Sequence, residues 1–216
     1  MISFFDVVFS LLAIIVLLLF MLPIMILLKL TGEHDIFYGQ ERIGKGGKKF
    51  KLWKFATMLR NSPDLPGGTY TSADDPRMLP MGKFMRKTKI NELPQLINIL
   101  TGEMSVIGYR PLMFDLYSEP SRSIILSNPP GLSGIGSVAF RNEEEILQKV
   151  DGEERDRYYR ERILPYKEQL EAWYARNRSI GHYFRLILMT IIAVLEPDYS
   201  GWMKLKDIPQ PPEGLF

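Results

Sequence analysis

The chain has 216 residues, enough for one domain with a hydrophobic core. Its 27 basic and 25 acidic residues leave a formal charge of +2, a balance that points to no nucleic-acid partner. The sequence has no cysteine, which excludes disulfides, thiolate metal sites and a cysteine nucleophile. Its two histidines, His34 and His182, are too few and too far apart in the sequence for a histidine-based metal site.

An uncharged apolar segment, VVFSLLAIIVLLLFMLPIMILL, extends from residue 7 to residue 28. At about 1.5 Å per residue, it is just long enough for a bilayer core of roughly 30 Å. A signal peptide would need cations ahead of this segment and a small-residue cleavage site after it, and neither is present. Basic residues begin at Lys29, so the positive-inside rule places the remainder in the cytoplasm. We therefore predict a membrane anchor over residues 1–30 and a cytosolic domain over residues 31–216.

Pro23 lies deep inside this apolar segment. A proline removes one backbone hydrogen bond and kinks a helix. The kinked helix either spans the membrane or bends so that it enters and leaves the same leaflet, and residue physics leaves both open.

The segment from Asp35 to Met58 indicates two short strands around a glycine turn. Its GKGGKK sequence, residues 44–49, lacks the ending of a phosphate-binding loop and precedes no helical pattern, so it predicts a hairpin turn. Residues 61–77 are rich in Pro, Gly, Ser, Thr and Asp, and they predict a long loop of the kind that often forms a functional lid.

Two segments of the C-terminal half precede its last apolar run. PPGLSGIG, residues 129–136, predicts a tight glycine-rich connection. Residues 143–178 predict a long charged helical stretch, interrupted around Pro165, whose charges form a solvated face.

RLILMTIIAVL, residues 185–195, is apolar but about half the length of a membrane span. It predicts either a core helix or a helix in the membrane interface. In the second case the lipid headgroups would lie near three aromatic residues, Tyr183, Phe184 and Trp202.

The segment RKTKINELPQLINIL, residues 86–100, predicts an amphipathic helix. Its apolar residues recur at helical spacing: Leu93, Leu96, Ile97 and Leu100. Pro94 is acceptable only in the first turn of a helix, which places Asn91 near the amino-terminal cap and Glu92 in the first turn. Asn is a good capping residue and an acid suits the helix dipole, so capping alone accounts for both residues.

A functional interpretation adds the neighbouring cations. Arg86, Lys87 and Lys89 precede the polar pair, and Arg110 follows in the sequence IGYRP. A helix start with convergent arginines is suited to phosphate, and the Glu92 carboxylate beside it could hold Mg²⁺ that neutralises a diphosphate.

Three motifs in this chain resemble the bacterial sugar transferases, the monotopic phosphoglycosyl transferases that start membrane glycoconjugates. The motifs are KFATM (residues 54–58), GKFMRKTKINELPQLINILTGEMSVIGYRPL (82–112) and PGLSGIGSVAFR (130–141). The resemblance covers nearly the whole chain. It implies a mainly helical α+β fold with a re-entrant helix kinked at Pro23, a small β-hairpin and interfacial helices. It also implies the bacterial inner membrane, with the bulk of the chain on its cytoplasmic face.

The resemblance implies a reaction in two steps. An Asp attacks the β-phosphate of a UDP-sugar and releases the nucleoside monophosphate, and polyprenyl phosphate then takes the phosphosugar from the enzyme. The product starts an exopolysaccharide, O-antigen or other glycan. Mg²⁺ is the implied cofactor, and the implied partners are the UDP-sugar, polyprenyl phosphate, membrane lipid and a second transferase chain, as a homodimer or a hetero-partner.

The resemblance also assigns site residues by position. Glu92 matches the Mg²⁺-associated glutamate, and Arg86 and Arg110 match phosphate-contacting arginines. Lys54 matches the basic residue of the KF motif, and Arg141 closes the motif that approaches the nucleotide.

Asn91 is the main departure, because it occupies the position of the nucleophilic Asp. A neutral amide has no anionic oxygen with which to form an acyl-phosphate. The chain departs from the family at five further places. Ala56 replaces a usual basic residue, Tyr109 a proline, and Pro129 an arginine. Ser137–Phe140 replaces a Gln-Val-Asn-Gly run, and Tyr183 replaces a usual acid.

Three interpretations follow. The chain is an active transferase in which Glu92 acts as nucleophile or as a base that lets polyprenyl phosphate attack directly. Alternatively, it is a catalytically silent paralogue that binds nucleotide sugar or lipid phosphate, or that partners an active transferase. In the third interpretation Asn91 is an engineered Asp→Asn change. The retained Arg86, Arg110 and Glu92 favour the first, a phosphoglycosyl transferase.

Overall fold

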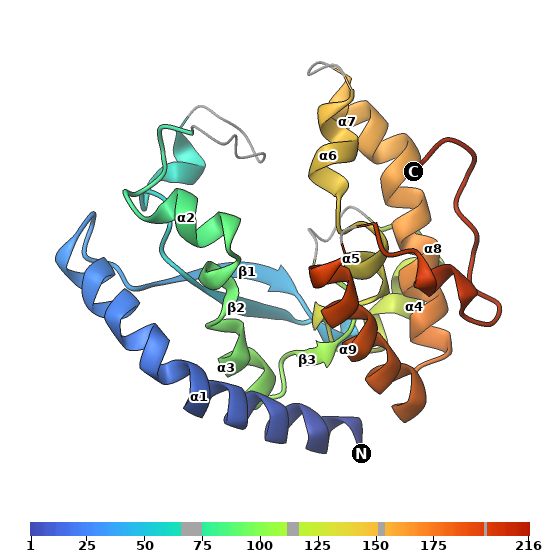
Figure 1. Cartoon of the computed structure of the whole chain (residues 1–216), viewed down its shortest axis with the longest axis horizontal. Helices are drawn as coiled ribbons and strands as arrows, with labels where there is room; N and C mark the ends of the chain where they lie inside the picture. The colour runs from blue at the N-terminus through green and yellow to red at the C-terminus, as the bar shows by residue number, and fades with distance from the viewer. Residues whose placement is uncertain (66–74, 112–116, 151–153, 197) are drawn as a thin grey trace. The chain divides into compact units, whose positions relative to one another are not determined.

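The computed structural model describes residues 1–65, 75–111, 117–150, 154–196 and 198–216. Over these residues the protein is mainly helical with two small two-stranded sheets, which confirms the predicted α+β class (Figure 1). The chain divides into two compact units. Unit 1 is Met1–Asp6, Arg42–Phe50 and Gly102–Phe216, and unit 2 is Val7–Glu41 and Lys51–Thr101. The predicted boundary between residues 30 and 31 stays a prediction.

Helix α1 (Ile2–Leu30) takes up the whole predicted apolar segment and contains Pro23. In the part of the chain that the structure describes, it is the one helix long and apolar enough to cross a membrane, by length and composition. Met21 and Leu28 are buried in the core of unit 2, whereas Leu19 and Phe20 are mostly exposed. The helix therefore has a packed side and an exposed apolar side.

Strands β1 (Phe37–Ile43) and β2 (Lys49–Phe55) pair with each other, as the sequence predicts. The turn between them contains a short 3₁₀ segment, η1 (Lys45–Gly47). Gly46 and Gly47 both adopt positive φ, which glycine tolerates without strain. GKGGKK is therefore a hairpin turn. Most of the predicted 61–77 loop lies outside the described residues, apart from a 3₁₀ turn, η2 (Ser62–Asp64), and its last residues.

The predicted helix of residues 86–100 is instead three short elements: α2 (Gly82–Lys87), the 3₁₀ turn η3 (Ile90–Glu92) and α3 (Gln95–Leu100). Lys89 has a left-handed backbone (φ 60°), so the chain turns between α2 and η3. The prediction that Asn91 caps the helix is wrong, because α3 begins after Pro94 and neither η3 nor α3 has a side-chain cap bond.

The predicted apolar stripe of this segment also differs from the buried face. Leu96 is buried, but Ile97 and Leu100 are at least a third exposed. Asn98 and Ile99 occupy the buried face instead. The break at Pro94 shifts the helical register, which a pattern read through from Leu93 does not detect.

Unit 1 contains a parallel pair of strands that the sequence did not predict. Strand β3 (Ser105–Ile107) pairs with β4 (Gly131–Ser133), with Ser105 opposite Gly131 and Ile107 opposite Ser133. β4 lies inside the predicted glycine-rich connection. A side chain at Gly131 would overlap the backbone of Gly108, so glycine permits this close approach.

Unit 1 also contains most of the helices of the described structure. They are α4 (Ser121–Leu126), α5 (Ile135–Ala139), α6 (Glu143–Gln148), α7 (Arg155–Tyr158), the π-turn η5 (Tyr159–Ile163), α8 (Leu164–Arg176), α9 (Ile180–Leu195) and the 3₁₀ turn η6 (Gly201–Lys204). α8 packs against α4 and α5, and α9 packs against α5 and β3 (Figure 1). Pro165 lies in the first turn of α8, where a proline is tolerated.

Helix α9 is only partly the core helix of one alternative predicted for residues 185–195, and its place in a membrane interface stays a prediction. One side is buried in unit 1, and the other carries a row of exposed apolar residues: Phe184, Leu188, Ile191 and Val194. The expectation for the nearby aromatic residues is partly wrong. Tyr183 and Trp202 are buried in the protein rather than available to lipid headgroups, whereas Phe184 is 39% exposed.

Candidate active site

Lys54 and Arg86 are placed by a short paired segment that follows β2. Lys54, near the end of β2, donates to Gln40 Oε1 across the hairpin at 3.2 Å. Residues 57–59 then pair with residues 77–79, through Leu59 N to Arg77 O (2.8 Å) and Leu79 N to Thr57 O (3.0 Å). Arg86, on α2, donates to Met58 Sδ at 3.4 Å. The KFATM motif therefore lies beside the helix that carries Arg86.

A buried ion pair holds the second strand of this paired segment. Arg77 and Asp75 are both nearly buried, and Arg77 Nη2 lies 2.6 Å from Asp75 Oδ2. The side-chain hydrogen bonds from Arg77 lower the pKa of Asp75 to about 2, and the charge of Arg86 adds to this effect. Arg77 also donates to Ser62 O, so the pair joins both ends of the predicted lid loop.

Asn91 and Glu92 lie on η3, directly after Lys89. Asn91 is only 6% exposed, and its Oδ1 atom has no hydrogen-bond partner within the described structure. Glu92 is half-buried. Because a buried polar atom without a partner costs free energy, the Asn91 oxygen is a point where a donor from a ligand would be favourable.

Apolar residues on either side of this polar pair fix it to the membrane helix. Ile90 and Leu93 pack into the unit 2 cluster whose buried members include Met21 and Leu28 of α1. The same cluster contains Met85 of α2, the residue before Arg86. The turn that presents Asn91 and Glu92 is thus packed on the apolar helix through its own neighbours.

Arg110 and Arg141 belong to unit 1, whereas the four preceding site residues belong to unit 2. Arg110 follows the carboxyl end of β3 and is exposed, and Arg141 follows α5 and is also exposed. The structure therefore brings Arg86, Asn91 and Glu92 together on consecutive elements of unit 2. It places Arg110 and Arg141 after the ends of separate elements of unit 1.

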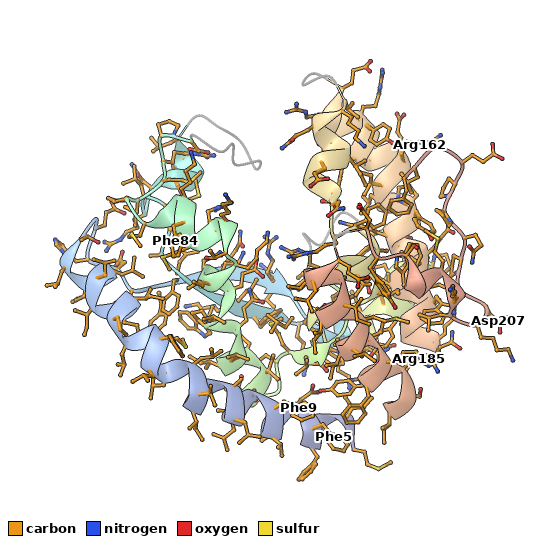
Figure 2. All side chains as sticks on the ribbon, in the orientation of Figure 1. Phe5, Phe9, Phe84, Arg162, Arg185 and Asp207 are labelled. Atoms are coloured by element: carbon orange, nitrogen blue, oxygen red, sulfur yellow. The ribbon has the colours of Figure 1, made fainter. Side chains whose placement is uncertain are left out.

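Two buried acids carry contacts that the sequence did not indicate. Asp6 is 4% exposed and accepts hydrogen bonds from Val106 N and Tyr183 OH, both at 2.8 Å, and from Ser105 Oγ. Phe5, labelled in Figure 2 at the amino end of α1, packs edge to face on Phe184 (5.0 Å between ring centres). The first turn of α1 is therefore fixed to β3 and α9.

Glu171 is the second of these acids and corrects the prediction of a solvated charged face. It is 3% exposed, and Glu168 on the same helix is also buried. The backbone N–H groups of Arg110 and Gly136 donate to its carboxyl group, and burial raises the pKa of this carboxyl to about 8. Its sequence context, LEAWYA, places one acid in a run of buried residues, and that is the signal that could have indicated its burial.

The donor set restricts which metal could bind. Outside the gaps in the described structure, no group of three or more His, Asp or Glu side chains could hold a metal ion. Mg²⁺ usually retains waters and binds one or two carboxylates together with substrate phosphates. Glu92 is a single half-buried carboxylate on η3, which contacts the helix that carries Arg86, and it fits that second mode rather than an all-protein cage.

Fold and site together define a membrane-anchored α+β protein, in which a polar turn with nearby cations is packed on the apolar helix. The chain belongs to the family described as bacterial sugar transferase, whose model matches residues 1–197. This membership confirms the resemblance carried by the three sequence motifs.

Named relatives agree with this family. An exopolysaccharide production protein, ExoY, of Sinorhizobium fredii is 36% identical over 163 residues, covering 68% of this chain and 72% of the relative. An undecaprenyl-phosphate galactose phosphotransferase of Salmonella typhimurium is 30% identical over 213 residues, covering 90% of this chain and 40% of the relative. A UDP-glucose:undecaprenyl-phosphate glucose-1-phosphate transferase of Escherichia coli is 32% identical over 170 residues, covering 76% of this chain and 33% of the relative. The chain thus spans well under half the length of the second and third relatives.

Proposed function

We propose that this chain is a phosphoglycosyl transferase, which moves a phosphosugar from a UDP-sugar to polyprenyl phosphate at the start of glycoconjugate synthesis. The observation that carries this proposal is the placement of Asn91 and Glu92 on a turn packed against the membrane helix through Ile90 and Leu93. One substrate is soluble and the other is a lipid, so a polar site fixed to an apolar helix is suited to both. The relatives whose names specify these substrates support the same reaction.

Asn91 changes the chemistry available to this site. Its amide cannot form an acyl-phosphate, so a covalent step at this position is excluded. We propose that Glu92, which is more exposed than Asn91, carries out the chemistry instead. As a base, Glu92 accepts the proton of the lipid phosphate, and the freed oxygen attacks the β-phosphorus. A new P–O bond forms to the lipid as the bond to the α-phosphate breaks and UMP leaves.

The phosphate-binding roles follow from charge. Arg86 and Lys54 in unit 2 are cations suited to phosphate. For Arg110 and Arg141 in unit 1, the roles in phosphate and nucleotide binding come from the family positions. Glu92 would hold Mg²⁺ together with the donor phosphates, and the bound ion would neutralise charge on the diphosphate. These assignments rest on the family positions and on the donor set of unit 2.

A silent paralogue is the second candidate, and Asn91 is the observation that favours it. In that case the chain binds nucleotide sugar or lipid phosphate without turnover, or it partners an active transferase. The unpartnered Asn91 oxygen is compatible with such binding, because it offers an acceptor to a ligand hydroxyl. Association with a second chain of the same or another transferase is part of this proposal.

The location we propose is the cytoplasmic face of the bacterial inner membrane, with α1 re-entrant and bent at Pro23. Support comes from both ends of the helix. Asp6 is hydrogen-bonded to β3 and α9, and the half that contains Met21 and Leu28 packs on unit 2. A helix fixed to folded segments of the chain at its start and in its second half is better suited to enter one leaflet than to cross the bilayer.

The deciding experiment is a donor screen. The full chain, purified in lipid nanodiscs, is incubated with polyprenyl phosphate, Mg²⁺ and a panel of UDP-sugars, and UMP release is measured. Wild type, Asn91→Asp and Glu92→Gln are compared, with Glu154→Gln as a matched control, since Glu154 is an exposed acid at the start of α7. We expect UMP release with at least one donor, and a loss of about a hundredfold or more in Glu92→Gln.

The variants separate the candidate functions. If Asn91→Asp alone releases UMP, the site is intact and the natural chain is silent. If no variant releases UMP with any donor, the transferase proposal is wrong. Calorimetric binding of the UDP-sugar by an inactive wild type would then favour the silent paralogue.

A further inference from the structure

Glu171 of α8 lies against two segments that follow the parallel strands of unit 1. The first segment, after β3, carries Arg110, and the second, after β4, carries Gly136 in the first turn of α5. The backbone N–H groups of both residues donate to the Glu171 carboxyl. One buried side chain therefore joins the segments at the carboxyl ends of β3 and β4.

Two glycines allow close approaches near Glu171. A β-carbon at Gly136 would overlap Glu171 Oε1, and one at Gly134 would overlap the carbonyl oxygen of Gly108. The carboxyl group therefore packs directly on the backbone of Gly136, and a side chain at that position would displace it. The glycine-rich sequence at residues 134–136 thus forms the surface that receives Glu171.

The charged and titratable groups around Glu171 come from several elements. Lys167, one turn earlier on α8, favours the ionised carboxylate, but it also pairs with Glu143 of α6. Three tyrosines also lie within reach of the Glu171 charge, and burial together with this charge raises the pKa of each: Tyr109, Tyr117 and Tyr174. Burial outweighs Lys167, and no described group pairs with Oε2. Burial therefore favours the neutral form of the carboxyl at neutral pH.

We propose that Glu171 is the positioning residue for Arg110: it fixes the Arg110 backbone to the glycine-rich segment so that the exposed guanidinium meets an anionic ligand. This inference rests on the proposed function to the extent that Arg110 binds phosphate. A neutral carboxyl holds the backbone without adding negative charge beside the ligand. Ionised Glu171 repels a diphosphate, so phosphate affinity falls as the carboxyl loses its proton.

The first test measures the affinity for UDP with Mg²⁺ by calorimetry on the full chain in nanodiscs. Wild type is compared with Glu171→Gln, which keeps an acceptor without a charge, and Glu171→Ala, which removes the acceptor. Glu168→Gln is the matched control, because this neighbouring buried acid instead accepts from Ser118 Oγ at 2.7 Å.

From about pH 7 to about pH 9.5, we expect wild type and Glu168→Gln to lose at least about fivefold in affinity, whereas Glu171→Gln stays constant. Glu171→Ala should bind about tenfold more weakly at both pH values, because the Arg110 segment is no longer held. The inference is overturned if Glu171→Gln loses affinity as wild type does, or if a folded Glu171→Ala binds as wild type does.

A second test does not depend on ligand binding. Amide NMR spectra of selectively labelled arginine and glycine follow Arg110 and Gly136 as the pH is raised. Both signals should titrate together in wild type with a midpoint near pH 8, and neither should do so in Glu171→Gln. Signals that stay constant in wild type, or that titrate in the Gln variant, contradict the inference. If wild type does not bind UDP, the proposed function fails while this titration still decides the role of Glu171.

Discussion

Three buried side chains with acceptor oxygens have different sets of partners. Asp6 accepts from two hydroxyl groups and a backbone N–H, and Glu171 accepts from two backbone N–H groups. Asn91 Oδ1 accepts from nothing in the described ranges. Leaving such an atom without a partner costs about 1–3 kcal/mol. The partnered oxygens of Asp6 and Glu171 thus serve the fold, whereas Asn91 Oδ1, which like Glu171 Oε2 has no described partner, is available to a ligand at the candidate site.

The unfolding free energy should depend on pH through Glu171. Its folded pKa of about 8 lies above its ordinary value of 4.5, so its favourable contribution is complete below pH 4.5 and is lost as the pH rises through 8. Denaturant unfolding of wild type and Glu171→Gln should therefore diverge by on the order of 4 kcal/mol across that window.

The Gln variant provides the internal control for this pH dependence. The other acid with a large shift, Asp75, has a lowered pKa of about 2, so its contribution changes only at more acidic pH. A constant difference between wild type and Glu171→Gln from pH 4.5 to pH 8 would show that the buried carboxyl does not titrate in this range.

Among the secondary-structure elements, α3 and β2 are joined by hydrogen bonds from one side chain to the strand backbone. Asn98 of α3 is fully buried, accepts from Trp53 N at 3.0 Å and donates to Lys51 O at 2.8 Å. Both partners lie on β2, which pairs with β1 as its one partner strand among the described residues. Asn98 therefore satisfies the backbone of β2 and joins α3, which follows the Asn91–Glu92 turn, to the hairpin that carries Lys54.

Asn98→Ala should lower the unfolding free energy by about 1–3 kcal/mol, because it removes two part-buried hydrogen bonds to the backbone of β2. Chemical unfolding in detergent measures the change. Asn61→Ala, at an exposed asparagine, should change stability by no more than about 0.5 kcal/mol. Equal effects of the two substitutions would mean that the Asn98 bonds add little.

At the scale of the whole molecule, α1 takes part in both compact units. Met1–Asp6 belongs to unit 1 through Asp6, and the remainder belongs to unit 2 through Met21 and Leu28. The exposed side of the helix is apolar, as is the exposed side of α9. Apolar surface of this extent is typical of contact with lipid.

The re-entrant path of α1 can be tested with single cysteines, because the chain has none of its own. Ser3→Cys, at the start of α1, and Ser200→Cys, in unit 1, are both exposed. We expect an impermeant maleimide to label neither in intact spheroplasts and both after lysis, since a re-entrant helix keeps its start on the cytoplasmic side. Labelling of Ser3→Cys alone in intact spheroplasts would instead indicate a spanning helix.

Features that depend on local pattern are predictable from the sequence. Uninterrupted apolar composition gives α1, glycines with positive φ give the β1–β2 turn, and the motif around Asn91 and Glu92 identifies the family. The sequence also shows that position 91 carries Asn where the family has a nucleophilic Asp, because only the residue type is compared.

Tertiary structure alone decided which polar groups are buried. Asp6 is hydrogen-bonded to residues about a hundred or more positions away in the sequence. Glu171 contacts the backbone of the segments that follow β3 and β4, and these strands of three residues each are too short to give a sequence pattern. The charge of Glu171 predicts a solvated side chain, but α4 and α5 pack on α8. Burial arises from contacts between distant segments, so the state of these acids follows from the fold and not from the residues beside them in the chain.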